Sequence, residues 1–134
     1  MLENRIEGNL IHGYGYSHTD LGAIYTLSKS PSSYITHNYA LDSSVGFGVY
    51  TDEGSNSYII RENVLLSGNQ WYAQNGVNTA NNTIQGNFGK TGRTIQGNTL
   101  VNDLNGVSAD GKKWAAEAGV LIGERGGRPV SNPK

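Results

Sequence analysis

A four-residue pattern, Ile-x-x-Asn, recurs along the chain and constrains its fold more than any other feature. It occupies residues 6–9, 35–38, 60–63, 84–87 and 95–98. Successive asparagines of the pattern are 29, 25, 24 and 11 residues apart. The first three intervals suit one coil of a solenoid, whereas the last is too short for one. The pattern therefore predicts stacked coils that stop or change shape after Asn87.

A second pattern lies inside each coil. Gly-Ala-Ile-Tyr-Thr at residues 22–26 matches Phe-Gly-Val-Tyr-Thr at 47–51, and Gln-Trp-Tyr-Ala at 70–73 follows more loosely. Two patterns with one period indicate at least two short strands per coil. The chain contains 19 glycines and 15 asparagines, and both residue types tolerate the left-handed backbone of tight corners.

Stacked coils place equivalent side chains in files, because parallel strands lie about 4.8 Å apart. The isoleucines 6, 35, 60 and 84 are expected to point inward as a dry core. The asparagines are expected to bond along the axis at a corner, as a structural ladder. Strand alternation predicts that Tyr25 and Tyr50 point outward, with Tyr72 below them.

Composition sets the broad limits on fold and partners. A length of 134 residues favours one domain, and a net charge of −1 gives no reason to expect nucleic acid. We find no apolar run near the ~20 residues of a membrane span and no cysteine. The repeat follows Met1 at once, so we expect no signal peptide. Three histidines without metal-ligand spacing and no Ca²⁺-type carboxylate cluster predict neither metal nor cofactor.

The C-terminal region does not follow the pattern of the repeats. Residues 112–118 read as a short helix, and Trp114 with the apolar cluster 120–122 is expected to cover the last coil. The sequence thus predicts an all-β, single-domain parallel β-helix of a few coils. Its coils span residues 1–109, and residues 110–134 form a C-terminal helical cap and tail.

Segments 20–26 and 48–55, together with the tail 114–118, resemble the pectin-lyase-like superfamily of right-handed parallel β-helix proteins. In particular they resemble bacterial secreted members related to glycoside hydrolases. The resemblance implies a carbohydrate-active protein with a polysaccharide or oligosaccharide as partner, secreted or at the cell surface. Such proteins are usually longer, and this chain starts within the repeat, like the C-terminal part of a larger β-helix. An open N-terminal coil would then self-associate edge to edge, or an N-terminal segment would fold over it.

The corner at residues 12–20 is longer than its equivalent in the next coil and is rich in His, Tyr and Asp. Long loops on a rigid scaffold often carry binding groups. His12, Tyr16 and His18 are candidate substrate-binding residues, and Asp20 is a candidate acid. The alternative is a Gly/Tyr loop packed on the coil face.

Asp52 and Glu53 follow the second tyrosine strand and are the other candidate catalytic acids. Glycosidases need two carboxyl groups about 5–5.5 Å apart for retention, or about 6.5–9.5 Å for inversion. An extended chain would separate Asp20 from Asp52 by over ~20 Å, so they can share a substrate only if the loop folds back. The alternative is a solvated acidic turn.

Tyr25 and Tyr50 could form a platform for sugar rings or a self-stacking ladder that stabilises the coils. Arg61 or Lys90 could serve as the base of a polysaccharide lyase, but no Ca²⁺ cluster accompanies them. Two functions therefore stay open. One is a carbohydrate-active protein with glycosidase-like acids, and the other is a non-catalytic structural or adhesion module.

Overall fold

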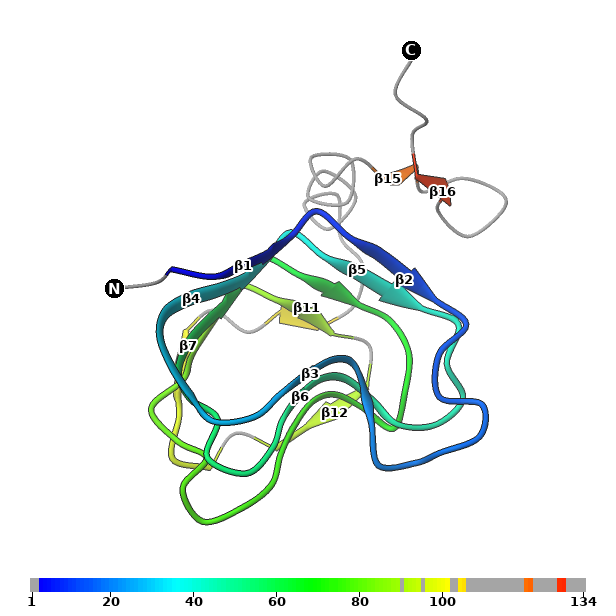
Figure 1. The fold of residues 1–134 in the computed structure, drawn as a ribbon. Coiled ribbons are helices and arrows are strands. Elements are labelled where there is room, and N and C mark those ends of the chain that lie inside the picture. The colour runs from blue at the N-terminus through cyan, green and yellow to red at the C-terminus, as the bar shows by residue number, and fades with distance from the viewer. Residues whose placement is uncertain are drawn as a thin grey trace.

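The computed structural model describes residues 3–89, 91–94, 96–101, 104–105, 120–121 and 128–129. These residues form an all-β parallel solenoid of about four turns (Figure 1). The described part contains no helix. The predicted helix at 112–118, Trp114 and the boundary between coils and cap at residue 109 lie outside the described residues.

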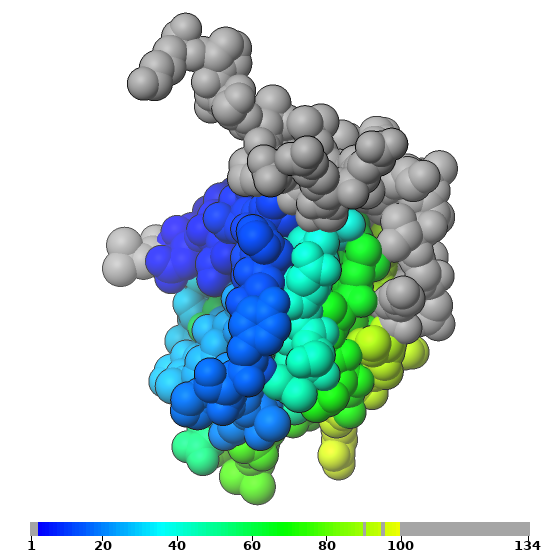
Figure 2. All heavy atoms as spheres, turned by 90° about the vertical axis from the view of Figure 1, so that its right-hand side faces the viewer, coloured from blue at the N-terminus to red at the C-terminus, as the bar shows by residue number. Residues whose placement is uncertain are grey.

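Three parallel sheets run the length of the stack. Sheet A contains β1 (Arg5–Glu7), β4 (Lys29–Thr36), β7 (Asn56–Arg61), β10 (Thr83–Gln85) and β13 (Thr99–Val101). Sheet B contains β2 (Leu10–His12), β5 (Tyr39–Leu41), β8 (Val64–Leu65), β11 (Phe88–Gly89) and β14 (Leu104–Asn105). Sheet C contains β3 (Gly22–Thr26), β6 (Phe47–Thr51), β9 (Gln70–Gln74) and β12 (Gly92–Arg93). Separately, β15 (Val120–Leu121) pairs with β16 (Arg128–Pro129) in antiparallel fashion. Figure 2 shows the coils as adjacent bands, from blue through cyan and green to yellow.

The predicted isoleucine file is confirmed. In sheet A, Ile6 pairs with Ile35, Ile35 with Ile60, and Ile60 with Ile84. The last three side chains are fully buried. One isoleucine per coil thus supplies the same core position, and its burial stabilises each pair of neighbouring coils.

The predicted asparagine ladder is also confirmed, at the corner between sheets A and B. Asn9 donates through Nδ2 to Oδ1 of Asn38 at 2.9 Å, Asn38 to Asn63 at 3.0 Å, and Asn63 to Asn87 at 2.9 Å. The residue before each asparagine has a positive φ, between 54° and 70°. Those residues are Gly8, His37, Glu62 and Gly86. The left-handed residue turns the chain, and the asparagine then satisfies the corner's backbone groups.

Asn98 does not continue this ladder. It lies at the corner between sheets C and A, where its Oδ1 accepts a hydrogen bond from the backbone N–H of Asn82 at 2.9 Å. Only 16 residues separate Asn82 from Asn98, against 24 and 25 in the preceding coils. The prediction that the coil changes after Asn87 is therefore confirmed: it becomes shorter, and β10 still pairs with β13.

Sheet C differs from the prediction at its third strand. Val49 pairs with Tyr72, and Tyr50 pairs with Ala73. Tyr72 consequently points inward, is fully buried and packs in the core beside Trp71. The prediction that Tyr72 extends the outward tyrosine file is wrong, because the hydrogen-bond register places its ring inside.

Candidate functional site

The outer face of sheet C carries the tyrosine pair that the sequence singles out. Tyr25 and Tyr50 are partners in neighbouring strands, with ring centroids 5.3 Å apart in an edge-to-face arrangement. Tyr25 is 43% exposed, but Tyr50 is only 4% exposed. The expected row of exposed tyrosines is therefore reduced to one accessible ring, with Tyr50 buried beneath neighbours that include Phe47.

Asp52 is fixed between two coils by its hydrogen bonds. Its Oδ2 accepts a hydrogen bond from the Tyr25 hydroxyl, and its Oδ1 accepts one from Nδ2 of Asn75 at 2.9 Å. The side chain of Asp52 is buried. The bond from Tyr25 holds the pKa of Asp52 below its usual value, and the same contact raises the pKa of Tyr25 to about 12. Asp52 is therefore an ionised acceptor.

Asp20 also acts on the tyrosine pair. Burial raises the pKa of Tyr50, and the nearby Asp20 carboxylate raises it further. The field of Asp20 also acts on Tyr25. Asp20 therefore lies near enough to both tyrosines to raise the pKa of each, and its sharing of a substrate with Asp52 stays a prediction.

The loop at residues 13–21 combines the two alternatives derived from the sequence. Tyr14 is half-buried, packs against the core and forms a hydrogen bond of 3.1 Å with Oγ of Ser67, two coils away. A side chain at Gly15, whose φ is +77°, would collide with the carbonyl oxygen of Val45. Tyr16, by contrast, is 73% exposed, and His18 is also exposed. One end of the loop is packed, while the other end offers side chains to solvent.

His12 stands apart from these residues. It ends β2 in sheet B, and its partner in the neighbouring strand is Leu41. Its side chain is exposed. Among the described residues, no hydrogen bond or ring contact joins His12 to the tyrosine pair, so its role in binding stays a prediction.

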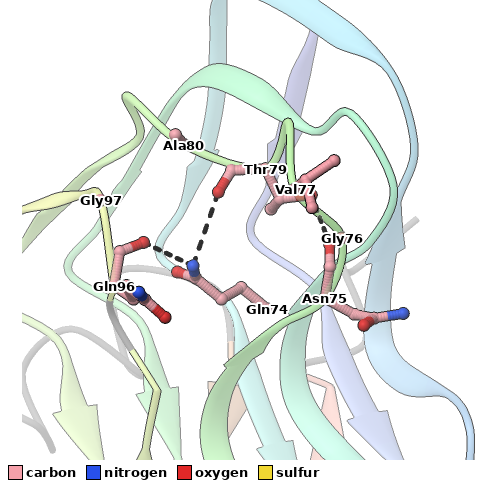
Figure 3. Close-up of a pocket in the computed structure, with 8 residues that line it drawn as sticks. All are labelled: Gln74, Asn75, Gly76, Val77, Thr79, Ala80, Gln96 and Gly97. Atoms are coloured by element: carbon pink, nitrogen blue, oxygen red, sulfur yellow. Dashed lines mark hydrogen bonds between the residues drawn. The ribbon is translucent and has the colours of Figure 1, made fainter.

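Two pockets open at the corner between sheets C and A, beside Asp52. One has a volume of about 390 Å³ and is lined by Glu53, Gly54 and residues 76–78. The other has a volume of about 580 Å³ and is lined by residues 74–77, 79, 80, 96 and 97 (Figure 3). Val77 borders both and is 99% exposed. The only signal of these pockets in the sequence is an apolar residue, Val77, within a polar corner.

The bridge between the tyrosine pair and the pockets is Asn75. Its amide binds Asp52, and its main chain lies at the edge of the larger pocket. Thr79 braces the same corner, because its Oγ1 accepts a hydrogen bond from the Gly54 N–H at 3.2 Å and donates one to the carbonyl of Asn75. Hydrogen bonds of Asn75 and Thr79 therefore connect the acidic and tyrosine side chains to the corner that forms the pockets. We call this surface, comprising Asp20, Tyr25, Asp52, Glu53 and the two pockets, the sheet C site.

The other candidates from the sequence lie elsewhere or outside the described part. Arg61 ends β7 in sheet A, near the ring of Tyr34 and 3.9 Å from Glu62. Lys90 lies outside the described residues. Within the ranges that the structure describes, no three His, Asp or Glu side chains form a group able to hold a metal ion.

Comparisons with family models, with curated proteins and with solved structures found no match to this chain. A search of the described residues also found no helix with the length and apolar character needed to cross a membrane. The assignment of function therefore depends on the geometry of the sheet C site.

Proposed function

We propose that the chain binds a polysaccharide or oligosaccharide at the sheet C site. The observation that carries the proposal is the convergence of Asp20 and Asp52 on the Tyr25–Tyr50 pair, next to two open pockets. A partly exposed tyrosine ring can stack on a sugar, and carboxylates accept hydrogen bonds from its hydroxyls. Tyr16, His18 and, more remotely, His12 would extend the contact surface.

Hydrolysis is a second candidate, favoured by the presence of three carboxylates at one surface. A general acid must carry a proton at the working pH. Because the pKa of Asp52 is lowered, Asp52 suits the ionised role, as nucleophile or base, and Glu53 or Asp20 would have to supply the proton. If no hydrolysis occurs, the chain is a non-catalytic binding or adhesion module.

We also propose a wider setting for this activity. The solenoid, the asparagine ladder and the residues 20–26 and 48–55 support a right-handed β-helix of the pectin-lyase-like superfamily. By that resemblance the protein would act outside the cell or at its surface. Self-association through the first coil belongs to the same proposal, since β1, β2 and β3 are edge strands among the described residues.

Binding is tested by calorimetry with neutral and acidic hexasaccharides, on the intact chain and on three variants. Tyr25→Ala should abolish or strongly weaken binding, whereas Tyr25→Phe keeps the ring and should lose less. Asn69→Ala, at an exposed corner outside the site, is the matched control. Failure of the intact chain to bind any hexasaccharide would refute the proposal.

Hydrolysis is tested separately by release of reducing ends from each ligand that binds. Turnover that disappears in Glu53→Gln, while binding persists, would support the glycosidase. Binding without turnover by the intact chain would favour the module.

A further inference from the structure

We infer that the two pockets of the sheet C site take an uncharged sugar and reject uronic acids. This inference deepens the proposed function and depends on it. It concerns the charge of the ligand and the place where it binds, neither of which follows from polysaccharide binding in general.

Among the described residues that line the pockets, the one charged side chain is acidic. The larger pocket is lined by neutral side chains and glycines alone, and the smaller pocket adds only the Glu53 carboxylate. Asp52 lies next to Glu53 and is held ionised by its bond from Tyr25. No lysine or arginine is among the described residues that line either pocket.

A sugar carboxylate would therefore find no cationic partner among the described residues that line these pockets. Proteins bind carboxylates through Arg, Lys or aligned N–H donors, or through a bridging Ca²⁺. The described residues offer no three-carboxylate group for such an ion. A uronic acid would instead meet the like charge of Glu53, which lines the smaller pocket, and this repulsion disfavours its binding.

An uncharged sugar meets suitable groups. The amide of Gln74 is already engaged, because its Nε2 donates to the carbonyl of Gln96 (Figure 3). Its Oε1 accepts a hydrogen bond from Asn98. The side-chain amide of Gln96 lines the larger pocket, is exposed and has no hydrogen bond among the described residues. It can both donate to and accept from a hydroxyl. Val77 adds an apolar edge against which the CH face of a sugar ring can pack.

The experiment compares cellohexaose and mannohexaose with the hexamer of galacturonic acid, each measured by calorimetry at low salt. We expect at least one neutral hexamer to bind at least tenfold more tightly than the acidic one, with or without added Ca²⁺. The Gln96→Ala variant should weaken neutral binding by about two- to tenfold, the worth of one hydrogen bond. Val77→Lys, which adds a cation where both pockets meet, should strengthen binding of the acidic hexamer. The matched control is Asn69→Lys, which adds the same charge away from the pockets.

The outcomes separate this inference from the proposal on which it depends. Equal or tighter binding of galacturonate by the intact chain, in EDTA, would overturn the inference and leave polysaccharide binding standing. If neither Gln96→Ala nor Val77→Lys changes the affinity for the neutral hexamer, the ligand binds outside the pockets. That result would overturn this inference alone. Failure of all the hexamers to bind would overturn both.

Discussion

The hydroxyl of Tyr25 donates a hydrogen bond to the carboxylate of Asp52, which belongs to the next coil. This contact ties two layers of the solenoid together at the sheet C site. It favours the ionised form of Asp52 and the protonated form of Tyr25. It therefore makes stability depend on pH in two separate ranges.

The first range is acidic. Because the folded-state pKa of Asp52 is below its ordinary 3.8, ionised Asp52 stabilises the fold fully above that value. This contribution is lost as the pH falls from 3.8 through the folded-state pKa. Asp52→Asn should be less stable than the intact chain at neutral pH, and the gap should narrow in acid. Urea unfolding at a series of pH values measures it. A gap that stays constant down to the lowest pH would contradict the prediction.

The second range is alkaline. The pKa of Tyr25 is raised from 10.0 to about 12, so its contribution is complete below pH 10 and is lost between pH 10 and about 12. Tyr25→Phe should lose less stability over this range than the intact chain does. Thermal unfolding followed by circular dichroism measures the effect. Tyr16→Phe, in the exposed part of the loop, is the control and should follow the intact chain.

Truncation of the isoleucine file should cost the most at a central coil. Ile60→Ala removes a fully buried side chain between Ile35 and Ile84, and we expect a loss of about 2–5 kcal/mol in the free energy of unfolding. Ile59→Ala truncates the neighbouring, partly exposed side chain on the other face of the strand and should cost less. Similar losses for the two variants in urea would argue against an inward file.

Loss of one asparagine of the ladder should lower the free energy of unfolding more than loss of an ordinary surface side chain does. Asn63 accepts from the amide and the backbone N–H of Asn38, and donates to Asn87 and to two backbone carbonyls. Asn63→Ala removes the acceptor of the buried Asn38 N–H and the donor to the Ile35 and Arg61 carbonyls, at a cost of about 1–3 kcal/mol or more. Asn69→Ala should stay within about 0.5 kcal/mol of the intact chain. Chemical denaturation of both variants gives the comparison.

Gly89 should be sensitive to a single methyl group. A Cβ at this position would overlap the indole of the buried Trp71, so Gly89→Ala should destabilise by about 1–3 kcal/mol. Gly92→Ala meets only the edge of Gln70, at 3.9 Å, and serves as the control. Addition of Trp71→Leu to Gly89→Ala tests the cause. A double-mutant cycle should show a favourable coupling, and additive losses would exclude the clash.

The sequence predicted the parts of this fold that repeat with little change. Ile35 and Ile60, like Asn38 and Asn63, recur at nearly one interval because each must occupy the same place in successive coils. The prediction for Tyr72 is wrong because sequence similarity to the Tyr50 strand does not determine the pairing register of the two strands. The hydrogen bonds of β6 and β9 align Tyr50 with Ala73 instead.

The site was less accessible to sequence reasoning because long-range contacts shape it. The loop that carries Asp20 is anchored where Tyr14 meets Ser67, 53 residues further along the chain. No local pattern encodes that contact. The sequence did name Asp20, Tyr25 and Asp52, while Asn75, Val77 and Gln96, which connect or line the pockets, passed unnoticed.

The asparagine ladder gives the stack a direction. The bonds between rungs all run one way: Nδ2 of Asn9 donates to Oδ1 of Asn38, Asn38 to Asn63, and Asn63 to Asn87. The row of bonds between rungs therefore has one direction, and among the described residues no rung lies on the outer side of Asn9 to donate to its Oδ1. If the first coils of two copies met face to face, the Asn9 Oδ1 acceptor of one copy would lie against the same acceptor of the other. If copies of the chain self-associate, growth of the stack would consequently be polar: head-to-tail addition would extend the row, and such an arrangement need not close on itself.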